Sequence, residues 1–438
     1  MKVRALFKNT RMSREDGGIT VLSLFMLVTS MVLGGMAIDI TNVMTARTQL
    51  QVAADAAAHA ALLARETKTA ADAAAAGAKV AALNMPASQY GDVLTAQEIS
   101  FGTWDAENLL FTPDINSKSA VMVLPKRTEE TGNPVATYLL KLVGVNSWDV
   151  RVQAIFTTYN PTCFREGLVA KDVVDLQSNN TYYNGFCIHS NKYVSLNSNN
   201  YFEPGTVVSM PNSEDIDLPN SGFKTNTGLK EALRSGSYYI RIIERIDDII
   251  RGLKNKDPDF LPDYIVAQSN IVTVDPKKAI TAALLTSGRL HVMTCTGAGT
   301  ANVPQNTVIK NIVMVTNCDI KFGQGVVLED VVIATTSTSA RSLSAASDMQ
   351  VGRNDNCAPG GGAQLVTMGG MSFPSGLKVY NGQLLAVGDI EFAANANGIK
   401  GASFVAGGTI SGTSNMGMGF CGTGMEDNFH ANYFRLVN

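Results

Sequence analysis

The sequence contains little charge and little histidine. Charged residues make up 17% of the 438 positions, the formal net charge is −3, and the four histidines are His59, His189, His291 and His430. This balance offers no basic surface of the kind that binds nucleic acid. The motifs HExxH, GxSxG and GxxxxGK[ST] are absent, so zinc proteases, serine hydrolases and P-loop NTPases have no support. We expect a protein with no enzymatic activity, cofactor or metal ion.

Cysteine is missing from the chain before Cys163 and never occurs as a CxxC pair. An even number of cysteines without zinc-type spacing favours structural disulfides in an oxidising compartment over a metal site. His189 follows closely after one of them, and we expect a surface histidine beside a disulfide there. The six cysteines are Cys163, Cys187, Cys295, Cys318, Cys357 and Cys421.

Charge is also missing from residues 17–38, a run of 22 positions. A helix of this length spans about 30 Å, enough to cross a bilayer. Residues 1–18 form a basic leader, which places the N-terminus in the cytoplasm and the rest of the chain outside. A cleaved signal peptide is the alternative, but no A-x-A-like cleavage site follows. We predict a transmembrane helix at 19–38, anchored by Ile19, Leu22, Leu24, Phe25, Leu27, Val32 and Ile38.

An alanine-rich helical pattern continues over residues 39–85 and is stopped by Pro86. Small residues recur on one face of this stem, and they allow another helix to approach closely. High helix propensity explains the alanine content but not the loss of a large apolar stripe. We expect close packing against other helices through Gly34, Gly35, Leu50, Ala53, Ala57 and Ala60.

These segments resemble a known family. "DGGITVLSLFMLVTSMVLGGMAID" followed by "ARTQLQVAADAAAHAALLA" is similar to the start of TadG-like proteins of the TadE/TadG group, which belong to the tight-adherence (Flp) pilus system of bacteria. The resemblance extends to about Tyr159. It implies a single-pass protein of the bacterial inner membrane, with pilus or pilus-assembly proteins as partners of the N-terminal helix and a C-terminal domain in the periplasm or at the cell surface.

Residues 86–159 read as a small α+β module of the kind that such proteins often carry. We predict strands at 97–102, 120–124 and 149–158, and a helix at 134–143.

Two features depart from relatives of this group. Pilin-like members are cut after a glycine that has glutamate five residues further on, whereas Gly18 is followed at that distance by Ser23. Many TadG proteins also carry a D-x-S-x-S metal motif, which is absent here. We therefore expect a permanently anchored protein and no metal-dependent adhesion by that route.

The C-terminal half is internally repetitive. "QLVTMGGMSF" at 364–373 aligns with "QLLAVGDIEF" at 383–392, and "KNIVMVTNC" at 310–318 aligns with "EDVVIATTS" at 329–337; the two offsets are equal, at 19 positions. Short β-branched runs that recur at a fixed period are typical of a β-solenoid (parallel β-helix), and an all-β sandwich is the alternative. The predicted fold class is therefore mainly β, with a solenoid at 160–438.

A helical insertion at about 227–255 interrupts this region, because isoleucine and leucine recur there at helical spacing. We expect it to dock on the flank or the end of the solenoid. A mobile lid over a groove is the alternative.

The cysteine spacing suits a solenoid. Cys163 and Cys187 are 24 positions apart in the sequence, and Cys295 and Cys318 are 23 positions apart, close to one coil plus a loop. Coils stack about 4.8 Å apart, within the range of about 4.4–6.8 Å that a disulfide requires between Cα atoms. We predict these two pairs, which leaves Cys357 with Cys421. The alternative is that some cysteines remain buried thiols.

Two polar clusters are candidate ligand-binding sites. Glu214, Asp215 and Asp217 could hold a weak calcium ion, but we expect a plain acidic turn there. The asparagines of 179–200 could form polar ladders at solenoid turns. They could instead contact a surface glycan together with Tyr182, Tyr183, Tyr193 and Tyr201.

Two functions follow from these observations. The first is a membrane-anchored protein for assembly of, or adhesion through, a tight-adherence pilus. The alternative is an envelope-anchored carbohydrate-binding or carbohydrate-active β-helix protein. A carbohydrate-active solenoid requires clustered carboxylates, or an arginine or lysine base, on one face. The acids of this region are scattered along the sequence, and no pair stands out.

The first prediction concerns processing. Because Ser23 occupies the position at which prepilin peptidase substrates carry glutamate, we expect the mature protein to keep its basic segment. Mass spectrometry of the purified protein tests this. A new N-terminus at Ile19 would contradict it.

Overall fold

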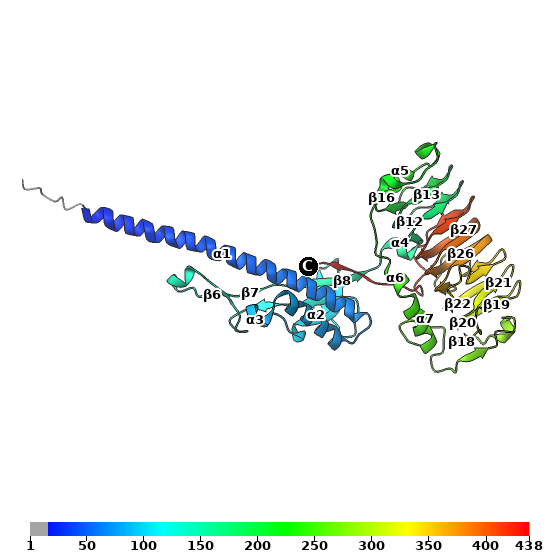
Figure 1. Cartoon of the computed structure of the whole chain (residues 1–438), viewed down its shortest axis with the longest axis horizontal. Coiled ribbons are helices and arrows are strands. Elements are labelled where there is room, and N and C mark those ends of the chain that lie inside the picture. The colour runs from blue at the N-terminus through cyan, green and yellow to red at the C-terminus, as the bar shows by residue number, and fades with distance from the viewer. Residues whose placement is uncertain (1–15, 438) are drawn as a thin grey trace, which may run out of the picture. The chain divides into compact units, whose positions relative to one another are not determined.

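The computed structural model describes residues 16–437, so most of the predicted basic leader lies outside the described residues. The chain divides into two compact units (Figure 1). The N-terminal unit contains the chain up to Tyr159 together with the returning segment from Tyr433, and the second unit comprises Asn160–Asn432. The second unit is therefore inserted into the sequence of the first.

A pair of helices and an antiparallel sheet build the N-terminal unit. Helix α1 (Asp16–Arg65) contacts α2 (Ala70–Asn84) and the sheet. The strand order is β2-β1-β3-β8-β30. The strands are β1 (Ile99–Asp105), β2 (Leu110–Pro113), β3 (Ala120–Val123), β8 (Ala154–Tyr159) and β30 (Tyr433–Leu436). Smaller elements are α3 (Ala87–Tyr90), η1 (Ala96–Glu98) and the strand pair β4 (Lys126–Arg127) and β7 (Val150–Arg151).

The alanine-rich stem is two helices rather than one. The helix predicted over 39–85 breaks between Arg65 and Ala70. Thr69 caps the second helix: its hydroxyl accepts from the Asp72 amide at 3.2 Å and donates to the Asp72 carboxylate at 2.7 Å. A Thr-x-x-Asp sequence is a local helix-start signal, so the break has a readable cause.

Small residues let these two helices pack closely. Leu50, Ala53 and Ala57 are fully buried in the core of the N-terminal unit. A Cβ atom added at Gly77 of α2 would lie 2.9 Å from the Ala57 carbonyl oxygen and 2.9 Å from the Ala61 Cβ atom. The close helix packing expected from the sequence is present, and the partner helix belongs to the same chain.

The predicted helix at 134–143 is wrong. In its place are strand β5 (Val135–Ala136) and the 3-10 helix η2 (Leu140–Val143), followed by strand β6 (Ser147–Trp148), which pairs with β5. A carboxylate of α1 binds the amides of residues 138–140, and this contact fixes the chain in a non-helical path.

The second unit is a parallel β-solenoid with three strands in each coil. Strands β9 (Gly167–Ala170), β10 (Val174–Leu176) and β11 (Thr181–Tyr182) form one coil. Each pairs in parallel with its equivalent in the next coil, namely β12 (Cys187–Ser190), β13 (Val194–Leu196) and β14 (Tyr201–Phe202). Parallel pairing throughout this sheet excludes the sandwich alternative, and it confirms the predicted fold class.

The repeat read from the sequence is the coil. Val308 pairs with Val327, and Met371 pairs with Ile390. The remaining strands are β15 (Val207–Met210), β16 (Leu233–Ser235), β17 (Val272–Val274), β18 (Arg289–Met293), β19 (Thr300–Val303), β20 (Val308–Thr316), β21 (Asp319–Phe322), β22 (Val327–Thr335), β23 (Leu343–Ala345), β24 (Gln350–Val351), β25 (Ala363–Thr367), β26 (Met371–Ala386), β27 (Ile390–Ala406), β28 (Ile410–Gly412) and β29 (Gly417–Gly419).

The coils are not stacked in sequence order. The chain enters at β9 and builds outward to β16, then crosses to the other end of the stack and builds back from β17 to β29. The last coil then pairs with the first: Ser403 lies opposite Gly167, Ile410 opposite Val174 and Gly417 opposite Thr181. Figure 1 shows this seam where the green strands meet the orange ones.

The helical insertion carries the chain between the two ends of the stack. It contains α5 (Leu229–Ala232), α6 (Arg241–Glu244) and α7 (Ile246–Asn255), and α7 contacts β20 and β25. The isoleucines at 246, 249 and 250 are buried. The insertion therefore docks on the flank, which is the first of the two interpretations given above. The other short helices of this unit are α4 (Thr162–Arg165), η3 (Ser213–Asp215), η4 (Gly222–Lys224) and η5 (Ala282–Leu284).

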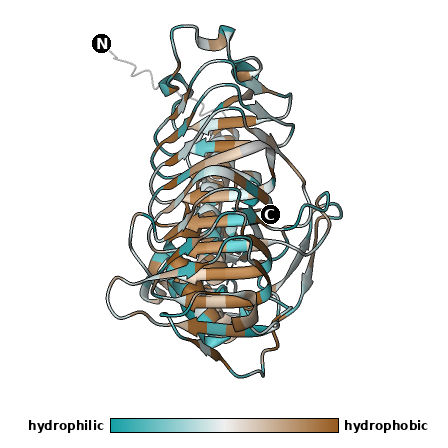
Figure 2. Ribbon diagram, turned by 90° about the vertical axis from the view of Figure 1, so that its right-hand side faces the viewer, coloured by the Kyte–Doolittle hydropathy of each residue, from teal (hydrophilic) through white to brown (hydrophobic). Residues whose placement is uncertain are grey.

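Apolar side chains fill the interior of the stack. The ribbon in Figure 2, coloured by hydropathy, has hydrophobic bands that recur along successive strands. The corners depend on residues that tolerate left-handed backbone. Asn311 and Asp330, 19 positions apart, have φ of 51° each, and Asn179 and Asn199 have φ of 61° and 62°. Asparagine and aspartate are among the few non-glycine residues that adopt this conformation readily.

A buried asparagine ladder joins three coils. Asn180, Asn200 and Asn226 are each at most 2% exposed. The Asn200 Oδ1 accepts from the Asn180 amide at 2.9 Å, and its Nδ2 donates to the Asn197 carbonyl at 2.9 Å and to the Asn226 Oδ1 at 3.1 Å. Asn180 and Asn200, two of the asparagines considered above, therefore form a polar ladder with Asn226, and their side chains are not available to a glycan.

The helix packing gives a prediction. Ala57→Leu should destabilise the α1–α2 pair by about 1–3 kcal/mol, because the extra methyl groups overfill a packed site. Hydrogen–deuterium exchange of α1 and α2 peptides in the full chain measures the change. Ala82→Leu, at an exposed position of α2, is the control and should leave exchange unchanged. Equal protection in both variants would contradict the close packing.

The asparagine ladder gives a second prediction about stability. Asn200→Ala should cost about 1–3 kcal/mol, because it leaves the buried Asn180 amide without its acceptor and removes one of the two Asn200 donors to the Asn226 Oδ1. Thermal unfolding of the full chain, followed by exchange at residues 180–227, measures the loss. Asn197→Ala removes only an exposed contact to Gln177 and should change stability by less than about 0.5 kcal/mol. A similar effect of both substitutions would show that the ladder adds nothing.

Candidate membrane-anchoring site and solenoid surface

The first part of α1 is a candidate membrane span. Among the described residues, α1 is the one helix that is long and apolar enough to cross a bilayer. Most of the predicted anchor residues are exposed within the N-terminal unit, and Val32 is half-buried. The exposed ones are Ile19, Leu22, Leu24, Phe25, Leu27 and Ile38.

The predicted helix-packing residues divide into three environments. Leu50, Ala53 and Ala57 are covered by their own chain, and Ala60 is half-buried. Gly34 is exposed, with open space where a Cβ atom would lie. Gly35 is buried, and a Cβ atom there would lie 2.8 Å from the Leu139 Cβ atom.

Leu139 belongs to a segment whose role the sequence did not reveal. Residues 135–148, here termed the apolar hairpin, consist of β5, η2 and β6 and read "VATYLLKLVGVNSW". Together with α1 this hairpin forms an apolar groove of about 390 Å³. The groove is lined by Val28, Met31, Val32, Gly34, Gly35 and Ile38 of α1, and by Leu139, Leu140, Leu142 and Val143 of the hairpin.

Asp39 joins α1 to the apolar hairpin. Its carboxylate accepts hydrogen bonds from the backbone amides of Tyr138 at 2.5 Å, Leu139 at 3.0 Å and Leu140 at 2.6 Å. Burial raises the pKa of Asp39, but these three amides more than offset that effect and hold the pKa below its usual value. Three positions further along α1, Asn42 Nδ2 donates to the Ala136 carbonyl at 3.1 Å. In the sequence, Asp39 is only the first charged residue after the apolar run, and nothing there indicates the hairpin as its partner.

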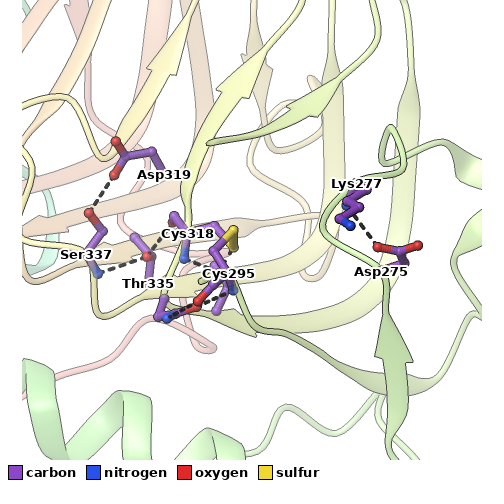
Figure 3. Close-up of a disulfide and its surroundings, with 9 residues drawn as sticks. Asp275, Lys277, Cys295, Cys318, Asp319, Thr335 and Ser337 are labelled. Carbon is purple, nitrogen blue, oxygen red and sulfur yellow. Dashed lines mark hydrogen bonds between the residues drawn. A yellow bond between two sulfur atoms is a disulfide. The ribbon is translucent and has the colours of Figure 1, made fainter. Parts of the chain in front are cut away.

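In the solenoid, the six cysteines form the three expected disulfides. Cys295–Cys318 joins neighbouring coils with its Cα atoms 5.4 Å apart (Figure 3). Cys163–Cys187 joins α4 to β12 over 5.0 Å, and Cys357–Cys421 fastens the segment after β29 over 5.7 Å. Loop closure suggests stabilisation of about 3–4 kcal/mol for each bridge.

Side chains of three coils surround the disulfide in Figure 3. The Asn317 carboxamide accepts from the Cys295 amide at 2.7 Å and donates to the Cys295 carbonyl at 3.0 Å. The Thr335 hydroxyl donates to the Cys318 carbonyl at 2.8 Å, and Ser337 donates to Asp319 at 2.5 Å. The bridge therefore reinforces a corner that is already held by side-chain hydrogen bonds between coils.

The four tyrosines proposed as glycan contacts do not form one strip. Tyr182 is fully buried and stacks on Phe202 with ring centroids 4.7 Å apart, so its inclusion was wrong. Alternation along β11 and β14 points its side chain into the core. Tyr183, Tyr193 and Tyr201 are 37–44% exposed and remain accessible.

His189 is buried. The expectation of a surface histidine beside a disulfide was therefore wrong. Its Nδ1 lies 2.7 Å from the Ser209 hydroxyl and its Nε2 lies 2.9 Å from Asn191 Oδ1. Asn191 also hydrogen-bonds the backbone of Tyr238, whose ring packs edge-on against His189. Burial lowers the pKa of His189 and favours the neutral ring. This chain of hydrogen bonds fastens the linker before α6 to the solenoid.

The acidic cluster at 214–217 is an acidic turn. Glu214 and Asp215 lie in η3, which Asn212 caps, and Asp217 accepts from Ser195 at 2.9 Å. Within residues 16–437, no group of three or more metal-binding side chains comes together.

The family comparisons follow this division of the molecule. Residues 17–83 match the family described as "Putative Flp pilus-assembly TadE/G-like", and residues 56–155 match "Putative Tad-like Flp pilus-assembly". No curated protein and no solved structure matches the chain. The two pilus-assembly matches confirm a TadG-like N-terminal region, which here contains α1, α2 and most of the sheet.

A third match, to the family described as "Domain of unknown function (DUF7867)", covers residues 167–422. It begins at β9 and ends just after β29, so it coincides with the coils of the solenoid. Because this match spans more than half of the sequence, the chain belongs to the family of proteins with this domain of unknown function (DUF7867), joined here to a TadE/TadG-like N-terminal region.

Proposed function

We propose that this protein is a non-catalytic component of the tight-adherence (Flp) pilus machinery, held in the bacterial inner membrane by α1. The observation that carries the proposal is the agreement between the pilus-assembly matches and one folded unit. Residues 17–155 supply the apolar helix, the α1–α2 pair, three of the five strands of the sheet and the start of a fourth, β8.

The orientation belongs to the same proposal. The basic leader favours a cytoplasmic N-terminus, which sends the solenoid to the periplasm or the cell surface. Three disulfides support an oxidising compartment for the solenoid.

In this proposal the solenoid presents a rigid surface to pilus components or to the surface to which the cell adheres. Several features favour a rigid solenoid over one in which the helical insertion moves as a lid. The coils are joined by continuous parallel ladders and closed by disulfides, and the helical insertion is docked by buried isoleucines. A solenoid of stacked coils offers an extended face of the kind that repeat proteins use for binding.

Deleting the gene in its native cells tests the proposal. We expect the deletion strain to lose Flp pili, measured by electron microscopy and by pilin in the sheared fraction, and the full chain to restore them. A full chain with Tyr183→Ala, Tyr193→Ala and Tyr201→Ala should restore pili equally well, because these exposed rings lie outside the TadG-like region.

A different result would favour the carbohydrate-binding alternative. In that case the deletion strain keeps its pili, and the triple tyrosine variant fails to bind cell-surface glycan that the parent chain binds. Pili that persist in the deletion strain would contradict a role in assembly.

A further inference from the structure

The apolar hairpin lies beside the candidate membrane span, not beyond its end. The groove between them reaches from Val28 to Ile38 on α1. At about 1.5 Å per residue, this stretch measures about 15 Å along the helix axis. The hydrocarbon core of a bilayer is about 30 Å thick. A span that ends near Ile38 therefore has the hairpin alongside roughly half of its length.

The composition of the hairpin suits lipid. Tyr138, Leu142 and Val143 are 58%, 77% and 57% exposed. A loop that faces water would be expected to carry polar side chains at such exposed positions. Lys141 is the only charged residue between 135 and 148. A lysine near a membrane boundary can extend its ammonium group to the headgroups, and tyrosine and tryptophan are enriched at that level.

The backbone of the hairpin is unusually well satisfied for an exposed loop. Asp39 accepts from three consecutive amides. The amides of Thr137, Leu142 and Val145 donate within the hairpin over 3.0–3.1 Å, and the Thr137 hydroxyl donates to the Val145 carbonyl at 2.5 Å. In hydrocarbon, irregular backbone persists only where its polar groups have partners.

We propose that the apolar hairpin is a second membrane element, which enters the half of the bilayer next to Ile38 and contacts lipid acyl chains along the groove with α1. Asp39 is the positioning residue: it supplies the acceptors that the hairpin amides would otherwise find in water. Lipid is favoured as the occupant because the exposed apolar surface of the hairpin continues that of the span itself. This inference rests on the proposed anchoring by α1.

Depth-dependent fluorescence quenching tests it on the full chain. The protein has two tryptophans, Trp104 and Trp148, and both are replaced by phenylalanine to give a silent background. Three reporters are then compared one at a time: Leu142→Trp in the hairpin, Phe25→Trp in the span and Ile115→Trp in an exposed turn of the N-terminal unit. The protein is reconstituted into vesicles of phosphatidylcholine and phosphatidylglycerol with brominated acyl chains.

We expect the Leu142→Trp and Phe25→Trp reporters to be quenched and the Ile115→Trp reporter to remain bright. Quenching at position 25 without quenching at position 142 would overturn the inference, leaving the hairpin to water or to a protein partner. If neither position is quenched, the anchoring by α1 itself fails, so the two failures are distinguishable.

The role of Asp39 needs its own variant. Adding Asp39→Ala to the Leu142→Trp protein should reduce quenching to the level of the Ile115→Trp reporter, because the hairpin amides lose their acceptors. The same substitution in the Phe25→Trp protein should leave quenching unchanged. Full quenching at position 142 without the carboxylate would show that Asp39 does not position the hairpin.

Discussion

Parallel backbone pairing between the first and last coils holds the solenoid together. Strands β9, β10 and β11 lie between β12–β14 on one side and β27–β29 on the other. Without this seam the coils from β9 to β16 and those from β17 to β29 would be two short stacks, each with an additional unpaired edge. Each coil buries its apolar face only against its neighbours, so the seam also completes one continuous core.

The seam also explains the place of the solenoid in the chain. Because the chain enters and leaves at adjacent coils in the middle of the stack, the start and the end of the inserted unit emerge near one another. They continue into β8 and β30, which are neighbours in the sheet of the N-terminal unit, with Tyr159 opposite Tyr433. A large domain is thus inserted between two adjacent strands without disturbing their pairing. The pilus-assembly matches end at residue 155, so they do not include the returning strand.

Local patterns predicted much of this fold. The constant offset between repeated segments identified the coils, and the cysteine spacing identified which coils are joined. Two features had local signals that the sequence analysis did not use: the capping sequence at Thr69, where the predicted single helix breaks, and the strand alternation that buries Tyr182. The seam was not readable, because Gly167 and Ser403 belong to one ladder but no fixed period relates them. The contact between Asp39 and the apolar hairpin was hidden for a similar reason: it joins a helix to a loop far along the chain, and nothing in either segment alone indicates the other.

The return of the chain through β30 has a mechanical consequence. A force that pulls on the solenoid enters the sheet through the C-terminal end of β8 and the N-terminal end of β30, which are register partners. Both strands are then drawn in the same direction, so the load does not peel one from the other. It acts on the two strands as a pair and shears β8 along β3. These two strands are paired from Ala154 opposite Val123 to Thr157 opposite Ala120. In shear the hydrogen bonds of a ladder bear load together, whereas in peeling they break one by one. The attachment is therefore arranged to resist tension applied between the two units.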